Sequence, residues 1–208
     1  MSICTPDGEK AALIAHYDAL VDEENDPFRD PEPLRAYMDL WDGESFLALM
    51  DLDGAESVLE IGAGTGRLGA SVIPLCRRYT GIDLSPKTVA RALENLADAS
   101  SATLLCEDLF AFSPPERYDV IYSSLTFFHI RDKAEAMKKI SALLTPGGRF
   151  VLSISKDTSS TLDYGTRRLP LYPDTEESTL RAAAEAALHL AARRETPNAI
   201  LFRFEKQR

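Results

Sequence analysis

The most constraining feature of the chain is a set of alternating glycines directly after a short apolar stretch. Residues 58–66 read VLEIGAGTG, which places Gly62, Gly64 and Gly66 behind a segment typical of a buried strand. Glycine lets a backbone turn tightly and approach a ligand closely. A helix that begins there offers free N–H groups and the positive end of its dipole. Because three glycines reduce stability, the pattern predicts a ligand-binding strand–loop–helix unit rather than a plain turn.

The remainder of the chain alternates strands and helices. Helices are predicted over 66–77, from Ser85, from Asp132 and over 175–187, and strands over 57–61, 79–83, 102–106, 118–123 and 149–155. This alternation indicates a parallel sheet with helices on both faces. Two last apolar runs, 188–196 and 199–206, are separated by two residues and must pair antiparallel. Residues 156–173 read as a polar loop without a period.

The first fifty residues have a different character. They predict an acidic helix over about 8–24 and a second helical stretch over 33–50, separated by a proline-rich breaker. The second stretch is expected to break at Asp42-Gly43, with Asp42 capping its second half.

Composition narrows the functional class. The chain has 208 residues, which suits one domain with a small appendage. Its net charge is −10, which disfavours nucleic-acid partners. No long apolar run or signal-peptide pattern is present, so neither a membrane partner nor a secreted protein is expected. Cys4, Cys76 and Cys106 are widely spaced, which predicts reduced thiols in a cytoplasmic protein and no metal.

Carboxylates at the strand ends favour an adenosine-type cofactor. Asp83 ends the second predicted strand, where a carboxylate can accept two hydrogen bonds from a ribose diol. Asp108 follows the third strand and could accept from the exocyclic amine of adenine. Glu60, two residues before the first glycine, would repel a pyrophosphate and attract an ammonium or sulfonium group.

A nicotinamide dinucleotide is the weaker alternative. The fingerprint GxGxxG is present at Gly64, Gly66 and Gly69, but that frame begins too late, because the strand already ends near Ile61. Asp83 fits either cofactor, so it does not separate the two classes.

Taken in order, these stretches resemble class I S-adenosylmethionine-dependent methyltransferases of the small-molecule type. The resemblance extends over residues 57–206 and rests on VLEIGAGTGRLG (58–69), YTGIDLSP (79–86), CEDLF (106–110), YDVIYSSLTFFHI (118–130) and LLTPGGRFVLSI (143–154). It implies a doubly wound, Rossmann-like α/β fold with seven strands in the order 3-2-1-4-5-7-6, the last strand antiparallel. It further implies a helical N-terminal lid, residues 1–50, on a methyltransferase domain, residues 51–208.

The resemblance also implies S-adenosylmethionine as the cofactor, S-adenosylhomocysteine as the product, and a role for each matching position. The glycine loop and Glu60 would hold the methionine part, whereas residues after the second and third strands would hold the adenosine. The implied cofactor-binding residues are Tyr17, Glu60, Gly62, Ala63, Gly64, Gly66, Asp83, Leu84, Asp108, Leu109 and Ser123. Tyr17 resembles lid aromatics of relatives, and packing in the core is the equal alternative for it.

The acceptor is less well defined. Residues 123–126 read SSLT and lack the pattern of relatives that methylate nucleobase or glutamine amines. A small-molecule acceptor is therefore expected, and a protein side chain is the alternative. His129 is the candidate catalytic base, with packing beside the following helix as its structural alternative. The loop after the fifth strand offers Tyr164, Arg167, Arg168 and Tyr172, either as cations and rings for an anionic acceptor or as plain surface.

A rival from another class is a non-catalytic module that binds the cofactor. The glycines and carboxylates speak against lost binding, but no residue is diagnostic of catalysis. The sequence therefore predicts a methyltransferase and leaves the accepting atom and the oligomeric state open.

Overall fold

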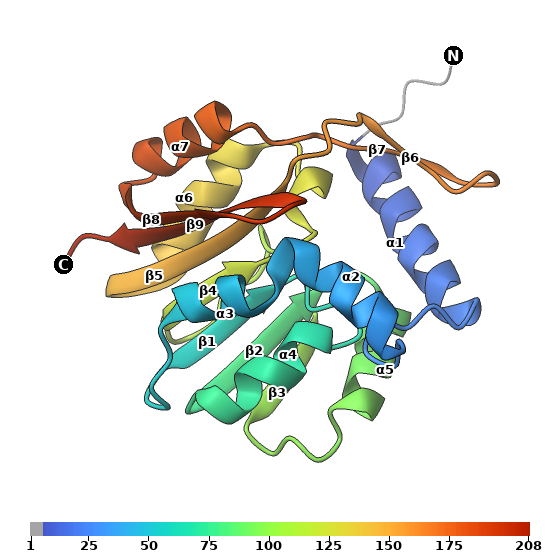
Figure 1. The fold of residues 1–208 in the computed structure, drawn as a ribbon, viewed down its shortest axis with the longest axis horizontal. Coiled ribbons are helices and arrows are strands. Elements are labelled where there is room, and N and C mark those ends of the chain that lie inside the picture. Colours follow the sequence, from blue (N-terminus) through green and yellow to red (C-terminus); the bar gives the residue numbers. More distant parts are fainter. Residues whose placement is uncertain (1–5) are drawn as a thin grey trace.

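The computed structural model describes residues 6–208 and is organised around a seven-stranded sheet in the order β3-β2-β1-β4-β5-β9-β8 (Figure 1). The five strands that run parallel are β1 (Ser57–Ile61), β2 (Arg78–Asp83), β3 (Ala102–Cys106), β4 (Tyr118–Ser123) and β5 (Leu144–Ser155). The last two, β8 (Leu188–Glu195) and β9 (Ala199–Lys206), form an antiparallel pair, and β9 runs against β5. The predicted fold class and strand order are confirmed.

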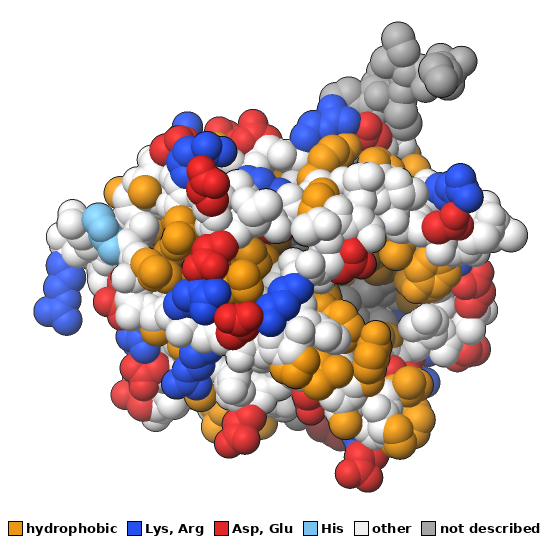
Figure 2. Space-filling view, turned by 45° about the horizontal axis from the view of Figure 1, so that its top comes forward, with side chains coloured by type: hydrophobic (Ala, Val, Ile, Leu, Met, Phe, Trp, Pro, Cys, Tyr) orange, Lys and Arg blue, Asp and Glu red, His pale blue; other side chains and the backbone are white. Residues whose placement is uncertain are grey.

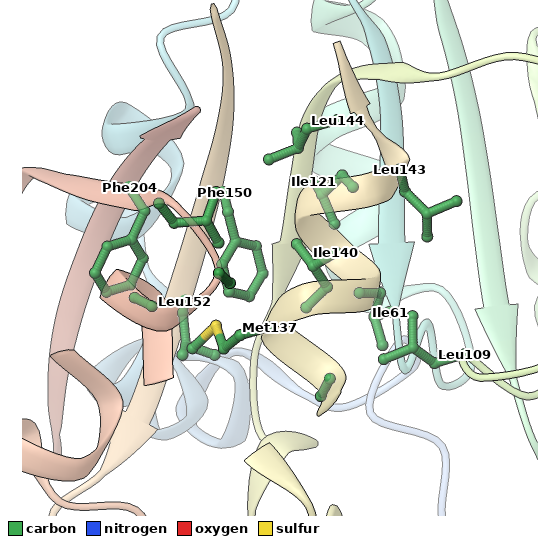
Figure 3. Close-up of a cluster of buried hydrophobic side chains, with 14 of the residues drawn as sticks. Ile61, Leu109, Ile121, Met137, Ile140, Leu143, Leu144, Phe150, Leu152 and Phe204 are labelled. Atoms are coloured by element: carbon green, nitrogen blue, oxygen red, sulfur yellow. The ribbon is translucent and has the colours of Figure 1, made fainter. Parts of the chain in front are cut away.

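Helices cover both faces of the sheet because the strand side chains alternate between two apolar layers. On one face, α6 (Lys133–Leu143) and α7 (Glu176–Glu185) pack on a cluster that includes Ile121, Phe150 and Leu152 (Figure 3). On the other face, α3 (Glu44–Met50) and α4 (Arg67–Val72) pack on a second cluster. This two-sided burial explains why the central strands read as continuous apolar runs.

Helix starts follow the local sequence signals. The Ser85 hydroxyl accepts from the Thr88 N–H at the start of α5 (Pro86–Asn95), and Asp132 accepts from the Glu135 N–H at the start of α6. The predicted helix over 66–77 is shorter than expected. It continues past α4 as the 3₁₀ turn η1 (Ile73–Leu75), because Pro74 cannot supply an α-helical N–H.

The N-terminal segment forms two separate arms beside the sheet. α1 (Pro6–Asp22) runs from a small hairpin down to α5, and α2 (Glu32–Asp42) precedes α3 (Figure 1). The break at Asp42-Gly43 is as predicted, but the capping role of Asp42 is wrong. Gly43 is the N-cap of α3 and the cap has no side-chain hydrogen bond, whereas the Asp42 side chain is fully buried between loops.

The stretch over 156–173 is not a featureless loop. It contains a hairpin of β6 (Thr161–Asp163) and β7 (Arg168–Pro170). The turn closes through a bond from the Tyr164 N–H to the Arg167 carbonyl at 2.9 Å, and Gly165 supplies the positive φ of +74°. Strands of three residues carry too short a pattern to be recognised as alternation.

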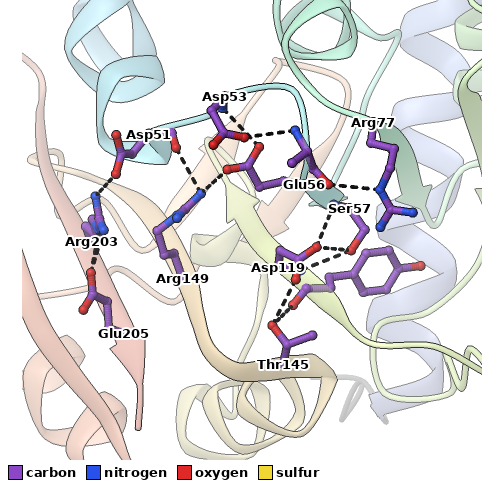
Figure 4. Close-up of polar contacts among 12 residues, drawn as sticks. Asp51, Asp53, Glu56, Ser57, Arg77, Asp119, Thr145, Arg149, Arg203 and Glu205 are labelled. Carbon is purple, nitrogen blue, oxygen red and sulfur yellow. Dashed lines mark hydrogen bonds and ion pairs between the residues drawn. The ribbon is translucent and has the colours of Figure 1, made fainter. Parts of the chain in front are cut away.

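A polar network joins the amino ends of several strands, opposite the glycine loop (Figure 4). Asp119 accepts from the Ser57 N–H and hydroxyl at 2.9 and 2.8 Å, and Arg149 pairs with Glu56 at 2.8 Å. These contacts stabilise the edge of the sheet that lies opposite the carboxyl ends of the parallel strands.

Within residues 6–208, no helix is both long and apolar enough to cross a membrane. Cys76 and Cys106 are free thiols, and Cys4 lies outside the described residues.

Candidate functional site

A cavity of about 730 Å³ lies at the carboxyl ends of the parallel strands. Its floor is formed by the loops after β1 to β5, and its walls by α1, α2 and the β6–β7 hairpin. Figure 2 shows the hollow on this side of the molecule, with hydrophobic side chains gathered beside it. The volume is in the range of pockets that hold small ligands, and its place is where open α/β sheets bind them.

The glycine loop forms part of the floor, and its glycines serve different purposes. Gly62 has φ of +78°, and a Cβ there would lie 2.8 Å from the Cβ of Thr126, so this glycine makes room for the β4 loop. Gly64 has φ of +56°, and a Cβ there would meet nothing within 4 Å. Gly66 is the N-cap of α4, where a Cβ would meet Leu96, and it does not line the cavity. Gly64 and the neighbouring Ala63 therefore face the ligand space.

Gly69, the last glycine of the alternative dinucleotide frame, has a packing role. A Cβ there would lie 2.8 Å from the Tyr79 hydroxyl. Gly81 on β2 leaves room for the same hydroxyl, again at 2.8 Å. Both glycines let Tyr79 reach Glu60 across the sheet, so their presence is explained without a pyrophosphate.

Glu60 is a buried carboxyl group on the wall of the cavity, 3% exposed. Its Oε2 accepts hydrogen bonds from the hydroxyls of Tyr79 and Tyr122, the second at 2.7 Å. Burial raises the pKa of Glu60 to about 7, although both tyrosine hydroxyls pull that pKa down. A carboxyl group poised in this way ionises readily when a cation is placed beside it.

The raised pKa of Glu60 predicts a pH-dependent stability. The unfolded pKa is 4.5, so between pH 4.5 and 7 the folded state keeps a proton that the unfolded state has lost. The free energy of unfolding should therefore fall as pH rises through this window, by about 3 kcal/mol from this residue. Urea unfolding of the wild type and of Glu60→Gln measures the difference. Glu60→Gln should lack this slope, and Glu107→Gln, on the same cavity, should retain it; a wild-type slope in Glu60→Gln would contradict the assignment.

Asp83 lies at the end of β2 and ties the glycine loop to α5. Its Oδ2 accepts from the Gly64 N–H and its Oδ1 from the Ser85 N–H, both at 3.0 Å. A carboxylate offers about four acceptor positions, so about two remain available toward the cavity. Burial raises the pKa of Asp83, and the backbone hydrogen bonds lower it. Leu84, the next residue, also lines the cavity.

Asp108 and Leu109 line the cavity after β3. Asp108 accepts from the Phe110 N–H at 2.8 Å and pairs with Lys10 of α1 at 2.6 Å. The N-terminal helix thus contacts the carboxylate that the resemblance assigns to adenine.

Tyr17 and His129 meet across the cavity. The Tyr17 hydroxyl lies 2.7 Å from Nε2 of His129, and the two rings are edge to face. Burial lowers the pKa of His129 to about 4 and raises the pKa of Tyr17. His129 is therefore neutral at physiological pH and able to accept a proton, with Tyr17 as its immediate hydrogen-bond partner.

Of the other residues predicted to belong to the site, some line the cavity and some do not. Tyr164 and Tyr172 line the cavity. Arg167 and Arg168 do not: they pair with Glu23 at 2.5 Å and Asp163 at 2.7 Å. Ser123 is fully buried with its hydroxyl on the Ile61 carbonyl at 2.9 Å, and the cavity wall begins at the next residue, Ser124.

A buried ion pair that the sequence did not predict lies beside the cavity. Oδ2 of Asp42 lies 2.6 Å from Nη2 of Arg67 and 2.6 Å from the Ser124 hydroxyl, and its Oδ1 is buried without a partner. Arg67 and Ser124 line the cavity, so Asp42 joins α2 to the loops after β1 and β4. Met38, four residues before Asp42, lines the cavity. Residues four apart lie on the same face of a helix, so the position of Asp42 on the apolar face of α2 was the sequence signal that its side chain would be buried.

Within residues 6–208, no group of three or more His, Cys, Asp or Glu side chains is placed to hold a metal ion.

The chain is similar to known methyltransferases in sequence and in fold. Residues 59–150 match the family model described as a methyltransferase domain. An uncharacterized methyltransferase of Geobacillus kaustophilus is 35% identical over 121 residues, which are 56% of this chain and 55% of that protein. The chain spans about half or less of the length of the curated relatives it matches.

Two solved structures share the fold. The N-methyltransferase NodS from Bradyrhizobium japonicum has a TM-score of 0.71 at 23% identity, over 86% of this chain and 99% of that one. The 1,6-didemethyltoxoflavin-N1-methyltransferase of Burkholderia thailandensis, solved with bound 1,6-didemethyltoxoflavin and S-adenosylhomocysteine, has a TM-score of 0.77 at 17% identity, over 100% of this chain and 93% of that one. Residues 59–150 therefore match a methyltransferase domain, and the strand order of the chain agrees with the fold of the class I S-adenosylmethionine-dependent methyltransferases that its ordered motifs resemble.

Proposed function

We propose that this protein transfers a methyl group from S-adenosylmethionine to a small-molecule nucleophile. The observation that carries the proposal is that one cavity contains an open glycine loop, the buried carboxyl group of Glu60 and the partly buried carboxyl group of Asp83. Gly64 leaves free space above the backbone, Asp83 keeps unused acceptor positions, and Glu60 offers an ionisable group, and all three line the cavity. This set suits a ligand with a ribose at one end and a cation at the other.

The residues that line the cavity suit the groups of that cofactor. Asp83 would hold the ribose hydroxyls, and Asp108 with the Leu109 N–H would hold the adenine edge. Glu60 would face the ammonium group and ionise in response. Leu84, Leu13 and Ile14 supply apolar surface on the same wall for the flat adenine ring.

When bound, the cofactor supplies an electrophilic methyl group on a sulfonium. In the transfer, the acceptor nucleophile forms a bond to the methyl carbon while the carbon–sulfur bond breaks and its electron pair stays on sulfur. The protein contributes alignment, because such a displacement needs close, in-line approach. The acceptor's proton passes to solvent or to the Tyr17–His129 pair, where the neutral imidazole is an acceptor.

We further propose that α1, with the rest of residues 1–50, acts as a lid. α1 lies along α5, where Asp18 and Asp22 contact Ser85 at 2.6 Å and Lys87 at 2.5 Å. At its other end Glu9 contacts Arg131 at 2.5 Å. Exposed ion pairs of this kind are individually weak, so α1 can open to admit ligands.

A small acceptor is supported by the size of the site and by relatives. The cavity is bordered by α1, α2 and the hairpin, and its volume of about 730 Å³ suits a small ligand. NodS is an N-methyltransferase by its title, and the toxoflavin enzyme binds a small heterocycle.

The test is an assay of S-adenosylhomocysteine release with a panel of small amines, phenols and thiols. The proposal expects release above background with at least one class, and loss of release in Asp83→Ala. Binding of the cofactor without release for any member of a broad panel, peptides included, would instead favour the non-catalytic binding module.

A further inference from the structure

Among residues 6–208, the wall of the cavity carries no unpaired basic side chain. Its basic side chains are Lys10, Arg67 and Arg131, and each is paired with a carboxylate, at 2.6, 2.6 and 2.5 Å respectively. Its acidic side chains outnumber them: Glu9, Glu60, Asp83, Glu107, Asp108, Asp132 and Asp157. An anionic acceptor would find no unpaired basic side chain among these wall residues, and the carboxylates of the wall would repel it.

One of these carboxylates, Asp157, stands apart from the cofactor residues. It follows β5, and no ion pair to it occurs within residues 6–208. Its Oδ1 accepts from the Ser159 N–H at 2.9 Å and from the Ser159 hydroxyl at 2.6 Å. These hydrogen bonds lower the pKa of Asp157, so it is ionised at neutral pH. Its second oxygen has no partner among the described side chains and is available to a ligand.

An aromatic side chain is linked to the backbone of Asp157 through a shared hydroxyl group. The Trp41 indole N–H donates to the Ser155 hydroxyl at 3.4 Å, and the Asp157 N–H donates to the same oxygen at 3.1 Å. Ser155 therefore joins the two residues, and all three line the cavity. Trp is the most effective ring for cations, and a charge-assisted hydrogen bond to carboxylate adds to it.

We propose that the methyl acceptor carries a basic amine on an apolar or aromatic body, with the amine held between Trp41 and Asp157. This inference rests on the proposed function, since it names the substrate class of the same site. The body of the acceptor would contact the apolar wall made by Met38, Leu162 and Phe128. The hairpin arginines, considered at the sequence level as partners for an anion, are paired outside the cavity and do not oppose an amine.

The test uses three probes of one shape and different charge: 2-phenylethylamine, 2-phenylethanol and 3-phenylpropanoate. Each is titrated calorimetrically into protein saturated with S-adenosylhomocysteine, near pH 7 and at low salt. The amine is expected to bind at least about tenfold more tightly than the carboxylate, with an advantage that shrinks as salt rises. Equal or tighter binding of the carboxylate, or no binding of any probe, would overturn the inference.

Variants separate this site from the cofactor site. Asp157→Asn should weaken amine binding roughly three- to tenfold, leaving the alcohol and S-adenosylhomocysteine unaffected. Asp163→Asn removes a carboxylate on the hairpin outside the cavity and should change none of the three. An unchanged amine affinity in Asp157→Asn would refute the assignment. If S-adenosylhomocysteine itself fails to bind, the proposed function fails; if it binds and the amine has no advantage, only the present inference fails.

Discussion

Replacing Asp83 by alanine is expected to weaken the binding of S-adenosylhomocysteine about ten- to a hundredfold. The carboxylate is assigned to the ribose hydroxyls, and each hydrogen bond to a charged group contributes about 1.5–3 kcal/mol. Part of that loss is recovered by water in the enlarged site, which sets the range given. Isothermal titration calorimetry of the wild type and the variant measures the change directly.

Controls are needed because Asp83 also has a structural role. It accepts from the Gly64 and Ser85 N–H groups, so its removal loosens the loop as well as the ligand contact. Asp83→Asn keeps the size and one acceptor oxygen and should bind with intermediate affinity. Circular dichroism and a melting curve establish that each variant is folded. Wild-type affinity in a folded Asp83→Ala protein would remove the ribose assignment.

Replacing Asp42 by alanine is expected to lower the free energy of unfolding by about 3–5 kcal/mol. The substitution leaves the Arg67 guanidinium and the Ser124 hydroxyl without the carboxylate that each contacts at 2.6 Å. Breaking one side of a buried pair is strongly destabilising because the remaining charge is uncompensated. For a chain of this size the melting temperature should drop by roughly 6–20 °C. Urea unfolding curves measure the free energy.

The chain offers a matched control for this prediction. Asp39 lies one turn earlier on α2 and reaches Arg67 only at 4.0 Å, with its side chain 59% exposed. Asp39→Ala should therefore change stability by no more than about 0.5 kcal/mol. A loss in Asp42→Ala as small as that of Asp39→Ala would show that the buried pair contributes little.

The fold could be predicted because it depends on sequence patterns between residues that are close together in the chain. The alternation of apolar runs with helical stretches and the two-residue link between the last strands determine the pairing, and the sheet has the expected order. The starts of α5 and α6 were predictable from Ser85 and Asp132, because a helix cap is a hydrogen bond between a side chain and the backbone only three residues further along the chain. Such signals are readable because the interacting residues are neighbours in the chain.

The parts that were not predicted depend on distant contacts. Asp42 has the sequence context of a helix cap, but Arg67 and Ser124, 25 and 82 residues away, bury it instead. Arg167 and Arg168 were candidates either for binding an anionic acceptor or for plain surface, and in the structure they pair with Glu23 and Asp163 outside the cavity. Trp41 and Asp157 meet through Ser155, a relation that exists only once α2 lies against β5.

The position of the candidate site was predictable for a topological reason. In a parallel sheet the carboxyl ends of the strands share one edge, so residues after β1, β2, β3 and β4 converge there. Glu60, Asp83, Asp108 and His129 all line the one cavity. The roles assigned to them remain predictions, since they depend on a bound cofactor.

The central claim is that this cavity binds S-adenosylmethionine, and a thermal shift experiment tests it most directly. The protein is heated with S-adenosylmethionine, S-adenosylhomocysteine or NAD in parallel. A ligand at a hundred times its dissociation constant adds about 2.7 kcal/mol of stability, which is roughly 5–10 °C for a chain of this size. The account predicts this shift with the two sulfur compounds and none with NAD. A shift with NAD alone, or with none of the three, would contradict it.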